Sequence, residues 1–235
     1  EQVKSQIPLH SEYGGVVPEI ASRSHFEVID YLTEQVLTIG KTTIADIDLL
    51  SVTQGPGLIG SLLVGLSFAK ALSFSRKIPL VPVDHIFSHI ESAFIENPDI
   101  AYPLIALVVS GGHTSLFYQE SKFEIELLSK TRDDAVGEVM DKIAKFYNLG
   151  YPGGPILDKL YKSGDKNRFS FTFPRMSDGS DDFSFSGYKT AVLKLTRENN
   201  IVERSPVFND LVASFLHSVV DYLLIKTRKA VENYQ

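Results

Sequence analysis

Hydrophobic residues in this chain form short continuous runs that alternate with longer stretches of mixed apolar and polar residues. A short apolar run is typical of a buried strand, whereas a period near 3.6 residues is typical of an amphipathic helix. We therefore predict strands at residues 48–53, 79–83, 103–109, 115–118 and 123–129. We predict helices at residues 24–39, 58–75, 85–95, 134–148, 155–163, 187–199 and 207–234. Strands that alternate with helices indicate an α/β fold with layers of helix and sheet.

Turn-forming residues indicate how the chain is divided. Asn97-Pro98 interrupts the pattern and predicts a boundary between an N-terminal lobe, residues 1–98, and a second lobe, residues 99–235. The segment His10–Glu19 is rich in Gly and Pro and predicts a loop, and residues 164–185 predict an irregular segment that carries many Asp, Ser and Phe residues.

Composition narrows the class of protein. Of the 235 residues, 43% are hydrophobic and 22% are charged, which is ordinary for a globular protein and argues against overall disorder. The net charge of -6 argues against a protein that binds nucleic acid unaided, because Lys and Arg make the phosphate contacts. The absence of Cys excludes disulfides and thiolate metal sites. No run of about 18 apolar residues and no secretion signal are visible, so we expect no membrane association and a cytoplasmic protein.

Two histidines are the first candidate for chemistry. His85 and His89 are four residues apart, which places both imidazoles on one face of a helix, where they could bind one divalent metal ion. From spacing alone, a pair without a ligand is equally plausible. A zinc-protease mechanism would require Glu directly after the first His, and that position is Ile86. Two His also leave a metal under-ligated, so a further ligand distant in sequence is required.

Two glycine-rich segments are candidates for phosphate binding. Val108-Val109-Ser110-Gly111-Gly112-His113-Thr114 follows a buried strand, and its glycines and hydroxyls could bring backbone N–H groups to a phosphate. The alternative is a plain hairpin turn. Gln54–Ser61 opens a helix but lacks the Lys-Ser/Thr of a Walker loop, and close glycine packing at that corner is at least as plausible.

Three acidic residues in the segment Asp133–Lys145 share one helical face in this prediction, namely Asp134, Glu138 and Asp141, and they could hold a metal-bound or ribose-bound ligand. The alternative is a solvated helix on which Glu138 pairs with Lys142 and Asp141 with Lys145.

The GYPGGP turn, residues 150–155, could pack a ribose or base against Gly153-Gly154, with Asp158 bonding hydroxyls. The alternative is a helix stop and restart. Asp182–Thr190 suits either a polar contact surface or a loop anchored in the core by Phe183 and Phe185.

Taken together, seven segments resemble the ordered motifs of one family, the tRNA threonylcarbamoyladenosine transferases of the bacterial type. The segments are YGGVVPEIASRSH, VTQGPGLIGSLLVGLSFAKAL, VDHIFSHI, VVSGGHT, DDAVGEVMDKIAK, YPGGPILDKL and FSFSGYKTAV. The resemblance implies an actin/Hsp70-like (ASKHA) ATPase fold of two lobes. It also implies transfer of threonylcarbamoyl from threonylcarbamoyl-AMP to N6 of the tRNA adenosine adjacent to the anticodon.

The resemblance also implies roles for particular residues. His85 and His89 match the metal ligands, for one divalent ion that is iron or zinc, with Fe²⁺ favoured. The implied partners are tRNA, threonylcarbamoyl-AMP, a paralogous (TsaB-like) subunit and a small (TsaE-like) ATPase. The residues that match substrate contacts are Val108, Val109, Ser110, Gly111, Gly112, Asp141, Gly154 and Asp158.

Two family segments have no counterpart here, the first phosphate loop and a C-terminal segment with an Asp that completes the metal site. We therefore expect a fold that is incomplete at both ends, a third metal ligand beyond residue 235, and no turnover by this stretch alone. Two rival functions stay open: a non-catalytic nucleotide-binding paralogue and a sugar-kinase-like ATPase. A metalloprotease is disfavoured because the protease glutamate is absent.

Overall fold

The computed structural model describes residues 1–203 and 205–234, which form two compact units, Glu1–Pro98 and Asp99–Gln235. The division falls directly after the Asn97-Pro98 break. Both units combine helices with strands, so the chain has α/β content as the sequence predicts.

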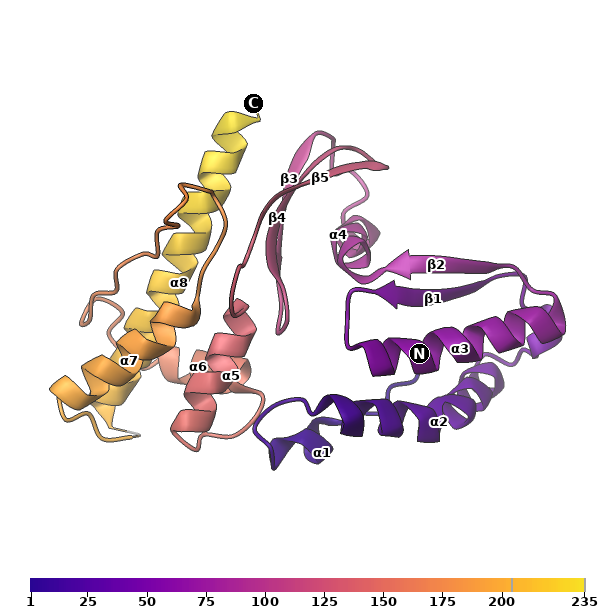
Figure 1. Ribbon diagram of the computed structural model, residues 1–235, viewed down its shortest axis with the longest axis horizontal. Coiled ribbons are helices and arrows are strands. Elements are labelled where there is room, and N and C mark those ends of the chain that lie inside the picture. Colours follow the sequence, from indigo (N-terminus) through magenta and orange to yellow (C-terminus); the bar gives the residue numbers. More distant parts are fainter. Residues whose placement is uncertain (204, 235) are drawn as a thin grey trace. The chain divides into compact units, whose positions relative to one another are not determined.

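Unit 1 is built around a strand–helix–strand segment (Figure 1). Strands β1 (Leu50–Gly55) and β2 (Leu80–Asp84) pair in parallel, and the helix α3 (Ile59–Arg76) connects them, because parallel neighbours require a long crossover. Helix α2 (Pro18–Ile39) packs against α3. The short 3-10 helix η1 (Ile44–Asp46) precedes β1, and α4 (His85–Glu96) follows β2 directly.

The N-terminal end of unit 1 differs from the sequence prediction. Residues Ile7–Ser11 form a short helix, α1, where a loop was expected from His10 onward. His10 is buried: its Nε2 lies 3.2 Å from Gln6 Oε1, and its Nδ1 accepts the N–H of Val17 at 3.3 Å. His10 therefore links α1 to the start of the following loop through these two contacts. Helix α2 starts at Pro18, earlier than expected, because proline is favoured in the first turn of a helix.

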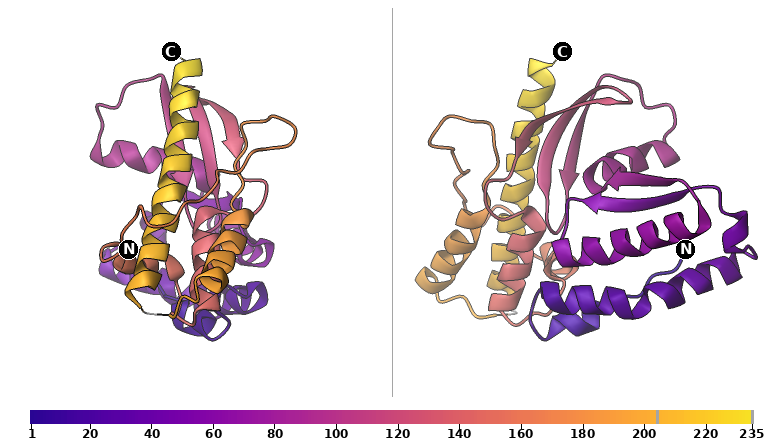
Figure 2. Two further views of the ribbon diagram at one scale, coloured as in Figure 1. Left: turned by 90° about the vertical axis from the view of Figure 1, so that its left-hand side faces the viewer. Right: turned by 45° about the vertical axis from the view of Figure 1, so that its right-hand side comes forward.

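Unit 2 contains an antiparallel sheet in the order β3-β4-β5, with bounds Leu104–Val109, Thr114–Ser121 and Glu124–Lys130. Four helices follow: α5 (Val136–Phe146), α6 (Gly153–Tyr161), α7 (Ser186–Glu198) and α8 (Pro206–Asn233). Helices α6 and α7 pack against α8, and α5 packs against α6 and α7 (Figure 2). The core of unit 2 lies where these helices meet.

The irregular segment between α6 and α7 is anchored in this core. Phe183 and Phe185 are fully buried, and their rings stack at a centroid distance of 5.8 Å. Phe171 contacts Phe215 of α8, with the ring centroids 6.2 Å apart. The aromatic residues of this segment are therefore packing residues, which is the second of the two interpretations left open above.

Helix α8 is long and apolar enough to cross a membrane by length and composition alone, which the search for apolar runs in the sequence did not anticipate. Within the protein, 56% of its most apolar stretch is buried. Phe208, Leu211 and Phe215 of this helix are at most 1% exposed and belong to the core. Burial of this kind identifies α8 as the core helix of unit 2.

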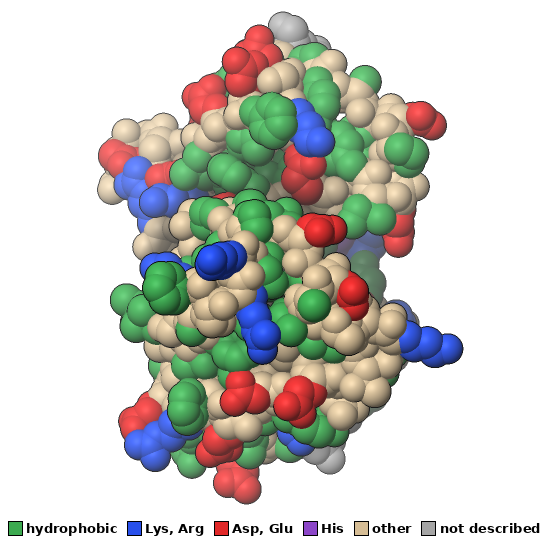
Figure 3. All heavy atoms as spheres, turned by 90° about the vertical axis from the view of Figure 1, so that its right-hand side faces the viewer, with side chains coloured by type: hydrophobic (Ala, Val, Ile, Leu, Met, Phe, Trp, Pro, Cys, Tyr) green, Lys and Arg blue, Asp and Glu red, His purple; other side chains and the backbone are tan. Residues whose placement is uncertain are grey.

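Charges are mixed on the face shown in Figure 3. Lys and Arg side chains there are separated from one another by acidic and hydrophobic ones. On the described residues visible in that view, no continuous basic strip is present.

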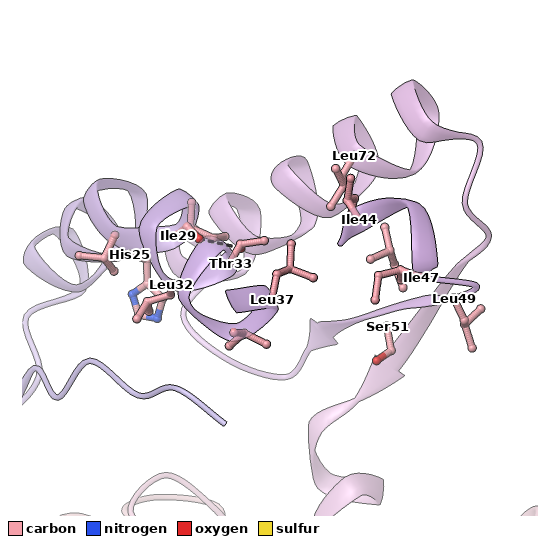
Figure 4. A pocket seen from close by; sticks show the side chains of 13 residues that line it. His25, Ile29, Leu32, Thr33, Leu37, Ile44, Ile47, Leu49, Ser51 and Leu72 are labelled. Atoms are coloured by element: carbon pink, nitrogen blue, oxygen red, sulfur yellow. Dashed lines mark hydrogen bonds between the residues drawn. The ribbon is translucent and has the colours of Figure 1, made fainter. Parts of the chain in front are cut away.

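An apolar groove of about 430 Å³ runs along α2, η1 and β1 in unit 1 (Figure 4). Leu32, Ile47 and Leu72 are among its lining residues, and His25 lies at one end. Among the described residues, β1 pairs with β2 and with no other strand. The groove is lined by residues of α2, η1, β1 and α3.

Candidate functional site

The His pair is positioned by the junction between β2 and α4. Asp84 ends the strand and caps the helix, accepting the backbone N–H groups of Ile86 at 2.8 Å and Phe87 at 3.0 Å. Ile86 and Ile90 are buried and fix the orientation of the helix, which leaves His85 half-buried and His89 exposed.

The two imidazoles face each other. His85 Nε2 and His89 Nε2 lie 3.2 Å apart, with the ring centroids 4.5 Å apart and the planes at 66°. Bonds of about 2.05 Å from one metal ion to two nitrogens would separate them by about 2.9 Å at a right angle and about 3.3 Å at a tetrahedral angle. The observed separation lies between these values, so the spacing of the pair is compatible with two adjacent ligands of one ion, and it also places the two Nε2 atoms within hydrogen-bonding distance of each other. Across residues 1–203 and 205–234, no cluster of three or more His, Asp or Glu side chains completes such a site.

The turn between β3 and β4 is held by its own serine. Ser110 Oγ accepts the N–H groups of Gly112 at 3.4 Å and His113 at 3.1 Å, and Ser110 N–H donates to the carbonyl of His113 at 2.8 Å. The next residue, Thr114, is completely buried, and its Oγ1 accepts the N–H of Val136 at 3.1 Å. The turn therefore rests on the first turn of α5.

The glycines of this turn are not required by the fold. A Cβ atom added to Gly111 or Gly112 would meet no described atom within 4 Å, and neither residue has a left-handed φ. Gly137 of α5 is the opposite case, since a Cβ there would lie 2.7 Å from Gly111 Cα and 2.8 Å from Ser110 O. The open space at Gly111 and Gly112 would allow a ligand to approach the backbone closely, and an exposed hairpin turn has the same open space.

Asp141 of α5 accepts the N–H of Gly153 at the start of α6, at 2.7 Å. Burial raises the pKa of Asp141, the Gly153 hydrogen bond opposes that change, and the negative charge of Glu138 adds to it, so the net pKa lies above the ordinary value. Burial and then the negative charge of Asp141 raise the pKa of Tyr151, which places this tyrosine near the carboxylate.

Gly153 and Gly154 have different roles. A Cβ at Gly153 would lie 2.5 Å from the carbonyl oxygen of Met140, so this glycine permits α6 to pack on α5. A Cβ at Gly154 would meet only Met140 Sδ, at an ordinary 3.7 Å. Asp158, one turn further along α6, is 62% exposed and lies 3.2 Å from Lys162 Nζ. Of these positions, Gly154 and Asp158 are open to a ligand, whereas Gly153 makes a packing contact.

The prediction that Asp134 shares one helical face with Glu138 and Asp141 is wrong for Asp134, whereas Glu138 and Asp141 both lie on α5. Helix α5 begins at Val136, so Asp134 lies outside it, and Lys142 Nζ contacts Asp134 at 2.5 Å and Glu138 at 2.9 Å. The ion pair of Glu138 with Lys142 is confirmed as the alternative interpretation. In the Gln54–Ser61 segment, a Cβ at Gly60 would lie 2.4 Å from Ser22 Oγ, which supports glycine packing between α3 and α2.

The sequence reasoning missed the structural roles of Asp84 and Gly137, and it assigned Gly153 to a ligand where the structure shows a packing contact. An Asp directly before the first residue of a helix is a recognised cap signal and could have been found. Gly137 carries a weaker signal, because a glycine inside a helix costs stability and so suggests a close contact. The structure brings Ser110 and Gly111 together with α5, and Asp141 together with Gly153 and its neighbour Gly154.

Comparison with known proteins gives a consistent assignment. A family model described as tRNA N6-adenosine threonylcarbamoyltransferase (TsaD) matches residues 1–235. The enzyme of that name from Clostridioides difficile is 47% identical over 231 residues, 98% of this chain and 68% of the relative. Its counterparts are 48% identical in Fusobacterium nucleatum, over 97% of this chain and 66% of the relative, and 50% identical in Thermodesulfovibrio yellowstonii, over 98% and 70%.

The chain thus spans about two thirds of the length of the relatives it matches. Among solved structures, YeaZ from Pseudomonas aeruginosa is similar over 44% of this chain and 48% of that one, with 15% identity and a TM-score of 0.34, a likeness too slight to support an argument about fold. The match to the family model over the whole chain, together with these identities, shows that the chain belongs to the tRNA N6-adenosine threonylcarbamoyltransferase family.

Proposed function

We propose that this protein transfers the threonylcarbamoyl group from threonylcarbamoyl-AMP to N6 of the tRNA adenosine adjacent to the anticodon. Family membership supports the reaction, and the open turn at Gly111 and Gly112 is the observation that carries the assignment of a substrate site. We also propose that the two units are the lobes of an actin/Hsp70-like fold, with residues 1–98 in one lobe and 99–235 in the other.

The glycine turn binds the phosphate side of the substrate in this proposal. Gly111 N–H donates to no described residue, so it can donate to a phosphate or carbamoyl oxygen, while Ser110 keeps the turn in place. Val108 and Val109 form the end of the strand that presents the turn. Pre-positioned donors of this kind contribute to catalysis by orientation and by stabilising developing negative charge.

The nucleoside side of the substrate lies against the junction of α5 and α6. Asp141 and Asp158 offer carboxylate oxygens to ribose hydroxyls, and Gly154 leaves space for the sugar or base. Asp141 is held by Gly153, so its direction is fixed before a ligand arrives. Lys162 forms an ion pair with Asp158, so the ribose hydroxyls would compete with Lys162 for that carboxylate.

His85 and His89 would hold one divalent ion, with Fe²⁺ favoured over zinc by family resemblance, and their 3.2 Å separation fits that role. When bound, such an ion supplies Lewis-acid polarisation of the carbamoyl oxygen. The described residues hold no cluster of three or more His, Asp or Glu side chains, so the proposal requires a third ligand in addition to the pair. A protease reaction is disfavoured by Ile86, which occupies the position of the catalytic glutamate and is buried in the core of unit 1.

Partners follow from the same proposal. The proposed substrate is tRNA, and the net charge of -6 favours help from other subunits in RNA binding, which we propose to be a paralogous subunit and a small ATPase. We expect the protein to act in the cytoplasm, where tRNA is modified.

The substitution Gly112→Ala tests the substrate site. Because the added Cβ meets nothing within the described protein, the free energy of unfolding should change by less than about 1 kcal/mol. Transfer should fall about 100-fold or more, because the methyl group keeps the substrate away from the turn. The measurement is the yield of modified adenosine in unmodified tRNA, by nucleoside mass spectrometry, with synthetic threonylcarbamoyl-AMP and the full-length protein.

Gly187→Ala is the matched control, because a Cβ there also meets nothing within 4 Å, and it should leave transfer unchanged. Full activity of Gly112→Ala would refute the turn as the substrate site. Absence of any transfer by the unsubstituted protein with its partners would refute the function itself.

A further inference from the structure

Asp133 joins two distant segments of unit 2. It lies between β5 and α5, and its carboxylate accepts hydrogen bonds from Ser184 Oγ at 2.5 Å, Phe185 N at 2.7 Å, Ser186 N at 3.2 Å and Ser186 Oγ at 2.8 Å. Ser186 is the first residue of α7, whose own N-cap residue provides no side-chain hydrogen bond. Asp133 therefore caps α7 from a separate part of the chain.

The charge of this carboxylate is maintained. Burial alone raises the pKa of Asp133, but the hydrogen bonds from Ser184, Phe185 and Ser186 outweigh it, and the net pKa lies below the ordinary value. Hydrogen bonds to an ionised acceptor are about twice as strong as neutral ones. The link between Asp133 and α7 is thus among the strongest polar contacts of the unit.

The residues around Asp133 bind the glycine turn. Thr131 N–H donates to the carbonyl of Thr114 at 2.8 Å, and Thr131 Oγ1 donates to the carbonyl of Asp134 at 2.8 Å. Three residues after Asp133, Val136 N–H donates to Thr114 Oγ1 at 3.1 Å. Gly137 N–H donates to Ser110 O at 3.3 Å. The connection that Asp133 anchors therefore forms the support of the turn.

Contact between this support and the turn leaves little room for movement. Gly137 is so close to Gly111 that a Cβ on Gly137 would lie 3.1 Å from Gly111 N. A shift at the start of α5 must then displace the backbone of the turn, because tightly packed atoms transmit displacement directly.

We propose that Asp133 is a positioning residue, which holds the start of α5 against α7 and so fixes the substrate-binding geometry of the turn at Ser110–Gly112. This inference rests on the proposed function for its effect on catalysis, although the mechanical link can be tested without any substrate. Asp133 touches no substrate in this scheme and acts only through the support of the turn.

The substitution Asp133→Asn in the full-length protein tests the link. The amide cannot accept all four hydrogen bonds as a carboxylate does, so α7 and the start of α5 should separate more readily. Backbone hydrogen exchange in residues 110–114 and 136–138 should become about tenfold faster, while exchange in the buried part of α8 stays within about twofold. Mass spectrometry of peptides from these segments provides the measurement.

Asp210→Asn is the matched control. Asp210 also binds the irregular segment, by accepting the N–H of Asp165 at 2.7 Å and pairing with Arg168 Nη1 at 2.9 Å, and both of these partners lie outside the turn and outside α5. Its replacement should speed exchange near residues 163–169 and leave the turn unchanged. If Asp133→Asn does not fold, Ser186→Ala, which removes one of the hydrogen-bonding groups, should give the same pattern with a smaller amplitude.

Kinetics separate positioning from a loss of folded protein. A smaller folded fraction lowers kcat and leaves KM unchanged, whereas a displaced turn raises KM. We expect KM for threonylcarbamoyl-AMP to rise about tenfold in Asp133→Asn, with restoration toward the original value in Asp133→Glu. Unchanged exchange in residues 110–114 in both Asp133→Asn and Ser186→Ala, or a fall in kcat alone, would overturn the proposal. Faster exchange in a protein that proves to have no transfer activity would support the link and reject the proposed function.

Discussion

Replacing His85 and His89 together with Ala in the full-length protein is expected to remove the bound divalent metal and to reduce transfer at least 1,000-fold. The physical reason is that the substitution removes both histidine nitrogens proposed to bind the metal. No cluster of three or more His, Asp or Glu side chains in the described residues can replace them. The fold should survive, because Asp84 still caps α4 and Ile86 and Ile90 still anchor it. Metal content by elemental analysis and modified adenosine by mass spectrometry are the two measurements.

Ser92→Ala serves as the control for this experiment, because Ser92 is on the same exposed helix and its hydroxyl only bonds the carbonyl of His89. It should retain metal and activity. Transfer that persists in the double His variant without bound metal would disprove the role assigned to the pair. Metal that persists at full stoichiometry would place the site elsewhere in the protein.

Local signals explain why much of the fold could be predicted from the sequence. The apolar run before Ser110 predicts β3 to within a residue of its start, because a continuous run with turn residues at both ends leaves few alternatives. The His pair was placed on a helix that does begin at His85, and its spacing determines that the two rings share one face. In both cases the deciding residues lie within one short segment.

Contacts between distant segments explain what could not be predicted. Asp133 bonds residues 51–53 positions away, and no periodicity connects them. The start of α5 was misplaced for the same reason: Ala135 is extended because the chain turns there to place Val136 N–H on Thr114, and Asp134 then pairs with Lys142 from outside the helix. Helix ends are set by such tertiary contacts as much as by propensity.

Substitutions at the adjacent glycines Gly153 and Gly154 give the second large effect. Gly153→Ala should reduce stability far more than Gly154→Ala. Gly153→Ala should destabilise unit 2 by about 3 kcal/mol, because the added Cβ would lie 2.5 Å from Met140 O and 2.8 Å from Ala144 Cβ, and backbone cannot move away cheaply. Gly154→Ala should cost less than about 1 kcal/mol, because its nearest neighbour is a flexible methionine sulfur at 3.7 Å and alanine favours helix. Urea unfolding followed by circular dichroism measures both values.

For nucleotide binding we expect the opposite order, with Gly154→Ala as the more damaging of the two substitutions. If Gly154 faces the ribose or base, its methyl group blocks that approach, so the affinity for AMP measured by calorimetry should fall about tenfold in a protein that is fully folded. Asp141 keeps its hydrogen bond from the Gly153 N–H in that variant, so the loss would come from blocked space and not from a misplaced carboxylate. A Gly154→Ala protein that binds AMP as tightly as the parent would remove Gly154 from the site, and equal stability of the two variants would contradict the packing between α5 and α6.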